Sequence, residues 1–111
     1  MDKTELMSLI NGAYAKLEAR KNEFYLASLN HAEASNKIDV ERARLLNSGV
    51  ITGRNAETRE AEMRTALVEE YDELMELEAK RDATRFHMDI AQLEVERARA
   101  ILRIHELSEA N

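Results

Sequence analysis

The sequence predicts an all-α fold, in which an antiparallel helical hairpin dimerises into a four-helix bundle. Three observations predict it: two long stretches carry apolar residues at helical spacing, the chain contains no proline, and one breaker segment, residues 47–55, separates the stretches. Two amphipathic helices joined by one turn bury their apolar stripes only by folding back on each other. We expect one domain, residues 1–111, with a first helix at about 3–47, a turn at 48–54 and a second helix at about 55–109.

The first helix is expected to begin after Asp2. Asp2 and Glu5 stand three residues apart, as in a capping box, just before an apolar run. Two places in this stretch favour a break: Gly12, because glycine is a poor helix former, and Ser35-Asn36. Whether either place breaks the helix stays open, as does whether Asn36 is exposed or is a buried polar residue that sets the register.

The positions of a glycine and an asparagine predict where the first helix ends and the second begins. Gly49 is placed to adopt the left-handed conformation that closes a helix, and Asn55 is a good N-cap for the second helix. Glu57 then lies near the positive end of the second helix dipole. Val50-Ile51, between these residues, are expected to close the end of the bundle.

The C-terminal half of the second helix carries two apolar rows that repeat every seven residues. One row contains Phe86, Leu93, Ala100 and Leu107 with Ile90 and Ile104 between them, and the other contains Met88, Val95 and Leu102. Together they form a stripe too wide for one partner helix.

A turn centred at Val50-Ile51 would place Leu17 near Phe86 and Ile10 near Ala91. The N-terminal start of the first helix would then lie opposite about residue 97. The apolar residues beyond this point would have no partner in their own chain, and we expect a second chain to cover them. The predicted partner is therefore a second copy, in a homodimer. The residues expected to form the dimer contact are Ile101, Leu102, Ile104, Leu107, Val95 and Met88.

The net charge of −6 lies on the second helix. Residues 69–78 contain six acidic side chains and no basic one, and the expected pairing places them opposite residues 23–32, which offer almost no positive charge. This acidic run is either a solvated face or a contact for a basic protein partner. The candidate contact residues are Glu69, Glu70, Asp72 and Glu73, with Arg54 and Arg59 from the turn.

The sequence predicts no enzyme, cofactor or metal site. The chain has no cysteine, and none of its three histidines follows an acidic residue by three positions, as a helical di-metal site requires. The acidic balance is opposite to that of a duplex-binding protein, so direct nucleic-acid binding is not expected. No apolar segment is long enough to span a bilayer, so we expect no membrane partner and a cytoplasmic location.

The segment from Gly53 to Glu60 matches the pattern Gly-(Lys/Arg)-Asn-x-x-x-Arg-(Glu/Asp). It resembles small all-helical coiled-coil proteins of bacteriophages and prophages, which carry this pattern at the start of their second helix. In physical terms the pattern supplies a glycine for the turn, an asparagine cap and, at Arg59, a side chain able to reach back to the loop carbonyls. The resemblance implies a phage-encoded factor in the host cytoplasm that acts on host or phage nucleic-acid-handling or defence machinery.

Together these features predict a non-enzymatic, self-associating coiled-coil protein that acts by binding another protein. Two other functions stay open. The first is a structural or assembly protein, in which the length of the helices matters more than any surface. The second is a nucleic-acid-binding accessory of recombination or replication.

Overall fold

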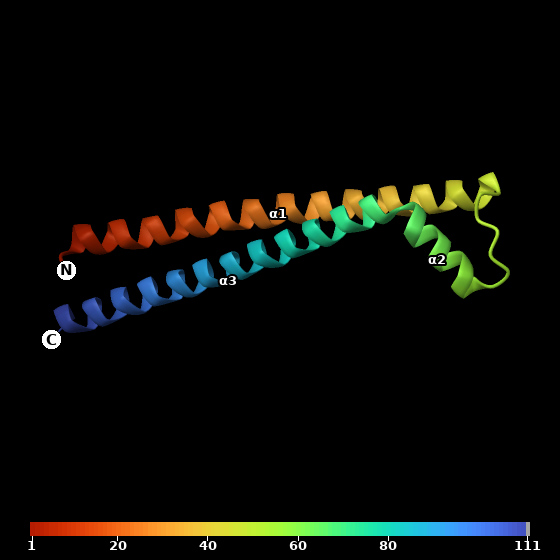
Figure 1. Ribbon diagram of the computed structural model, residues 1–111. Helices are drawn as coiled ribbons and strands as arrows, with labels where there is room; N and C mark the ends of the chain where they lie inside the picture. The colour runs from red at the N-terminus through yellow and green to blue at the C-terminus, as the bar shows by residue number, and fades with distance from the viewer. Residues whose placement is uncertain (111) are drawn as a thin grey trace. The chain divides into compact units, whose positions relative to one another are not determined.

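The computed structural model describes residues 1–110, which form three helices and no strand. Helix α1 spans Lys3–Ser48, α2 spans Ala56–Ala66 and α3 spans Val68–Ala110. The chain reverses between α1 and α2, and the parts of α1 and α3 that pack together within a unit run antiparallel (Figure 1). The all-α hairpin is confirmed, and dimerisation stays a prediction. Packing divides the chain into a first unit, residues 1–26 and 82–110, and a second unit, residues 27–81.

Helix α1 is continuous through both places where a break was possible. Its start is capped as expected, because the Asp2 Oδ1 atom accepts a hydrogen bond of 2.8 Å from the Glu5 N–H. Gly12 and Ser35-Asn36 all lie inside the helix, and Asn36 is exposed. A glycine or asparagine in a helix costs only about 1 kcal/mol or less. Burial of the apolar stripe of α1 outweighs this cost.

Replacing Gly12 by alanine is expected to stabilise the protein by about 1 kcal/mol, because Gly12 is an exposed residue inside a helix. A Cβ atom at Gly12 would meet nothing within 4 Å. Urea denaturation followed by circular dichroism measures the change. The matched control is Ala19→Gly, at another exposed position of α1, which should lower the stability by a similar amount. An unchanged midpoint for Gly12→Ala would contradict the helical assignment at this position.

The turn follows the predicted pattern. Gly49 adopts a positive φ of 77°, and the Asn55 Oδ1 atom caps α2 by accepting a hydrogen bond of 2.8 Å from the Thr58 N–H. Gly53 is required for a different reason. A Cβ atom there would lie 2.8 Å from the Arg59 backbone nitrogen, so the loop passes too close to α2 for any side chain.

The expected single helix at 55–109 is wrong at Leu67, which separates α2 from α3. Leu67 has φ −112° and ψ 28°, outside the helical region, although its N–H still donates to the Met63 carbonyl at 2.9 Å. No glycine or proline marks this break. The Leu67 side chain is only 4% exposed and belongs to a core cluster with Ile38 and Leu45. Burial of this leucine offsets the loss of helical geometry at one residue.

The expected pairing of the helices is also wrong. In the first unit, Leu17 packs with Ala91 and Val95 instead of Phe86, and Ile10 shares a cluster with Ala98. The expected pairing treated the whole of residues 55–109 as one helix against α1. The loop between α1 and α2 is centred beyond Val50-Ile51, and the break at Leu67 follows it, so α1 meets residues that lie further along the chain.

Candidate protein-binding surfaces

The observed pairing of α1 and α3 buries, wholly or in part, several of the residues that were expected to form the dimer contact. Val95 is 2% exposed and packs with Leu17 inside the first unit, where Met88 covers the same cluster. Ile101 and Leu102 are partly buried against the cluster of Leu6, Ile10 and Ala98. The expectation that the residues beyond about 97 lack an intrachain partner is therefore wrong for Ile101 and Leu102. Met88 and Val95, also expected in the dimer contact, are covered inside the first unit. Ile104 and Leu107 are 65% and 59% exposed.

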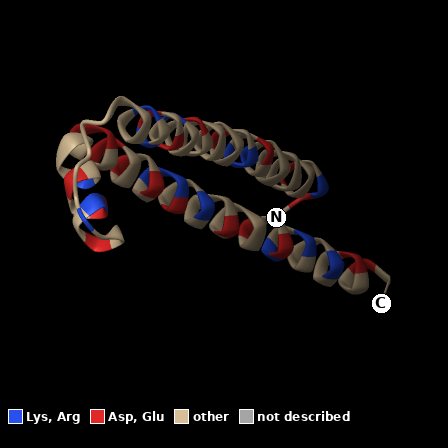
Figure 2. Cartoon of the chain, turned by 90° about the vertical axis from the view of Figure 1, so that its right-hand side faces the viewer, with Lys and Arg blue, Asp and Glu red and all other residues tan. Residues whose placement is uncertain are grey.

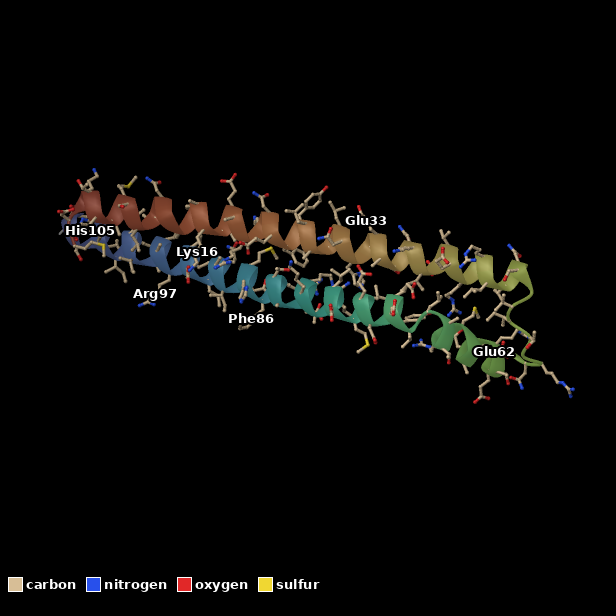
Figure 3. The ribbon with its side chains drawn as sticks, turned by 45° about the horizontal axis from the view of Figure 1, so that its top comes forward. Lys16, Glu33, Glu62, Phe86, Arg97 and His105 are labelled. Carbon is tan, nitrogen blue, oxygen red and sulfur yellow. The ribbon has the colours of Figure 1, made fainter. Side chains whose placement is uncertain are left out.

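The exposed apolar residues of α3 form a second row, which we call the outer seam. Its members are spaced alternately by four and three residues, the pattern of a coiled-coil contact. Phe86 and Arg97 point away from α1 (Figure 3), on the face of α3 nearly opposite to the buried Ala91, Val95 and Ala98. The outer seam contains Phe86, Ile90, Leu93, Arg97, Ala100, Ile104 and Leu107, all of them exposed.

Helix α1 has no comparable second row. In the first unit, Met7 and Tyr14 are exposed seven residues apart, but the next positions of that row are Glu18 and Lys21. The row continues at the exposed Tyr25, so Glu18 and Lys21 interrupt its apolar residues. Helix α3 therefore has two apolar faces, whereas α1 has one. The sequence predicted the two rows of α3, although it did not predict which of them α1 covers.

A polar cluster joins the three helices in the second unit. The Arg42 guanidinium of α1 donates to both carboxylate oxygens of Glu60 in α2, at 2.9 and 2.5 Å, and to the Tyr71 hydroxyl of α3 at 2.7 Å. Arg64 completes the cluster, with its guanidinium 4.8 Å from the centre of the Tyr71 ring. These residues are far apart in the sequence, and no motif marked them. Their contacts hold α2 against α1 and α3.

The hydrogen bonds from Arg42 lower the pKa of Glu60 below its ordinary value of 4.5. A carboxylate whose pKa is lower in the folded state stabilises the fold above its unfolded pKa, and this contribution is lost as the pH falls through the folded pKa. We expect the urea midpoint of the wild type to fall faster below pH 4.5 than that of Glu60→Gln, which cannot titrate. Urea titrations from about pH 3 to 6 measure the difference. Parallel curves for the two proteins would contradict the proposed coupling.

The acidic run lies along α3 in the second unit. Glu69, Asp72 and Glu73 are exposed, and Glu70 is half-buried. Glu70 and Glu73 line a shallow hollow with Lys37 of α1, so the expectation that the facing segment carries almost no positive charge is wrong. The pairing error explains this difference, because this part of the run lies beside residues 30–37, which overlap the expected 23–32 only at residues 30–32.

The two arginines of the turn have different environments. Arg54 is exposed in the loop, whereas Arg59 is half-buried and its Nη1 atom donates to the Gly53 carbonyl at 3.3 Å. The expectation that Arg59 reaches back to the loop is confirmed, so Arg59 supports the turn. Acidic and basic residues are mixed along α2, in the order Glu57, Arg59, Glu60, Glu62 and Arg64 (Figure 2).

Two histidines of the described residues each lie next to a charged side chain. His31 lies 3.2 Å from an Arg81 nitrogen, and His105 lies 3.1 Å from a Glu109 oxygen. Within residues 1–110, no three histidine, cysteine or acidic side chains gather where they could bind a metal ion. In the same range, no helix is both long and apolar enough to cross a bilayer.

No protein-family model matches this chain, and neither a curated protein nor a solved structure matches it. We therefore infer function from the surfaces described above. Of these, the outer seam is the least compatible with exposure to water, because large apolar residues repeat along it at coiled-coil spacing.

Proposed function

We propose that this chain is a non-enzymatic coiled-coil protein that self-associates through α3 and acts by binding another protein. The observation that carries the proposal is the outer seam, where Phe86, Leu93 and Ile104 are each more than 60% exposed on a helix whose other face is already packed. Burying one such side chain contributes about 1.5–3 kcal/mol. A homodimer would bury both copies of this row and join two hairpins into a four-helix assembly.

The second part of the proposal concerns the partner protein. The exposed carboxylates of Glu69, Asp72 and Glu73 give the second unit an acidic surface suited to a basic protein surface. Glu70 and the exposed Arg54 extend this candidate contact. The resemblance of residues 53–60 to phage proteins supports a factor that acts in the host cytoplasm on nucleic-acid-handling or defence machinery.

Self-association is tested by the mass of the protein in solution. We expect sedimentation equilibrium at about 10 µM to give a dimer of the 12.7 kDa chain, and the Leu93→Glu/Ile104→Glu variant to be a helical monomer. The matched control, Tyr14→Glu/Leu26→Glu, replaces exposed apolar residues of α1 and should stay a dimer. A well-folded monomeric wild type would refute self-association.

Partner binding is tested by removing negative charge. Glu69→Gln/Asp72→Asn/Glu73→Gln should reduce capture of the partner from a bacterial lysate by at least tenfold, quantified by mass spectrometry, because the acidic surface is lost. The control removes the same charge at other exposed positions, with the changes Glu18→Gln, Glu57→Gln and Glu106→Gln. Equal capture by both variants would reject the acidic contact and favour a structural role.

A salt-dependent shift of DNA at physiological ionic strength would favour the nucleic-acid accessory instead.

A further inference from the structure

The order of residues along the outer seam indicates how a second copy would pair with it, an inference that rests on the self-association proposed above. From Ile90 to Leu107 the seam reads as two large apolar residues, Arg97, Ala100 and two further large apolar residues. This order is nearly the same from either end, with a long and a small residue at the centre. A pattern of this kind suits a two-fold axis perpendicular to the helix.

We propose that the outer seams of two copies pair antiparallel, with Arg97 of one copy opposite Ala100 of the other. A coiled-coil seam alternates between two kinds of heptad position, a and d. In an antiparallel pair, each a position of one helix lies opposite a d position of the other helix. In this register Leu93 lies opposite Ile104 of the second copy and Ile90 lies opposite Leu107 of the second copy. All four apolar layers therefore pair large aliphatic side chains, and the arginine lies over the smallest residue of the seam.

The charges beside the seam fit the same register. Glu96 and Arg103 are exposed residues on one flank of the seam, each next to a seam residue. In the antiparallel register Glu96 lies opposite Arg103 of the second copy, and the two-fold axis repeats this pair. Ala100 lines a shallow hollow together with Glu96 and Arg103. This hollow accommodates Arg97 of the second copy next to the Glu96 carboxylate.

Parallel pairing gives a poor match. The central layers would place Arg97 against Arg97 of the second copy and Ala100 against Ala100 of the second copy. Two like charges would then meet in one layer, and two small alanine side chains would leave the next layer poorly filled. On the flanks, Asp89 would approach Glu94 of the second copy, another pair of like charges. Residues at the contact therefore disfavour a parallel dimer and favour an antiparallel one.

Cysteine cross-linking tests the direction of pairing, because the chain has no cysteine of its own. Mixing Leu93→Cys with Ile104→Cys under mild oxidation should give a disulfide-linked dimer on a non-reducing gel, whereas neither variant alone should give one. In the proposed register, Leu93 lies roughly 16 Å along the axis from Leu93 of the second copy, beyond disulfide reach. Cross-linking of either single variant would establish a parallel contact and overturn the proposal.

Charge reversal tests the register. Glu96→Arg and Arg103→Glu should each weaken dimerisation by about tenfold, since each puts two pairs of like charges across the contact, and the double variant should restore it. The control is Arg99→Glu, on the same hollow and farther from the seam, which should change dimerisation little. A dimeric wild type in which the double variant does not recover would overturn this register and leave self-association intact. A monomeric wild type would overturn both proposals.

Discussion

Replacing Leu67 by alanine is expected to lower the free energy of unfolding by about 3 kcal/mol, because truncating a buried leucine leaves a cavity. Leu67 is 4% exposed and packs with Ile38 and Leu45, while partly buried Ile51, Tyr71 and Leu74 cover the same cluster. The residue also occupies the break between α2 and α3, so few neighbours can move to fill the space. Urea denaturation monitored by circular dichroism gives the change.

The matched control for this prediction is Leu46→Ala, the same substitution on α1 of the same unit. Leu46 is 48% exposed, and we expect a loss of less than about 1 kcal/mol. Similar losses for Leu46→Ala and Leu67→Ala would show that the break does not bury Leu67. That result would restore the single second helix that the sequence predicts.

The second large effect is expected for Arg42→Met, which keeps an unbranched apolar stem and removes the guanidinium with its donors. The change leaves the Glu60 carboxylate and the Tyr71 hydroxyl without the guanidinium that they share. Hydrogen bonds to charged groups contribute about 1.5–3 kcal/mol, and partial exposure of this cluster places the expected loss near 2 kcal/mol. Thermal and urea unfolding measure the change.

Arg44→Met provides the control for Arg42→Met. Arg44 makes an ion pair with Glu41 on the same helix at 2.7 Å, and its side chain is 62% exposed. Exposed pairs of this kind contribute less than about 1 kcal/mol, so the control should differ little from the wild type. If both variants lost the same stability, the cluster would not be what holds α2 in place.

The parts of the fold that the sequence predicted are those governed by local chemistry. Asp2, Gly49 and Asn55 act at the ends of helices, where one side chain or one backbone conformation decides the outcome. The two apolar rows of α3 were also predicted, because a seven-residue repeat can be recognised in the sequence without knowing which helix packs against it. The expected hairpin follows from these elements.

The parts that the sequence did not predict depend on contacts between distant residues. Nothing near Leu67 signals a break, because what stabilises the break is burial against Ile38 and Leu45 of α1. The pairing differs because the loop is centred beyond Val50-Ile51 and the break follows it, and Val95 is buried inside the first unit as a result. The cluster of Arg42, Glu60 and Tyr71 was missed for the same reason, since its members come from three different helices.

Within residues 1–110, no polar or charged residue is buried. Sliding one helix past its neighbour by a whole heptad would therefore leave no polar group stranded in the interior, and apolar contacts alone discriminate weakly against such shifted states. The alignment is instead fixed at the rim, by the 3.1 Å pair of Lys16 and Glu94 in the first unit and by Arg42 in the second. Polar contacts at the edge of each interface, and not buried polar residues, thus favour one alignment over those shifted by a heptad.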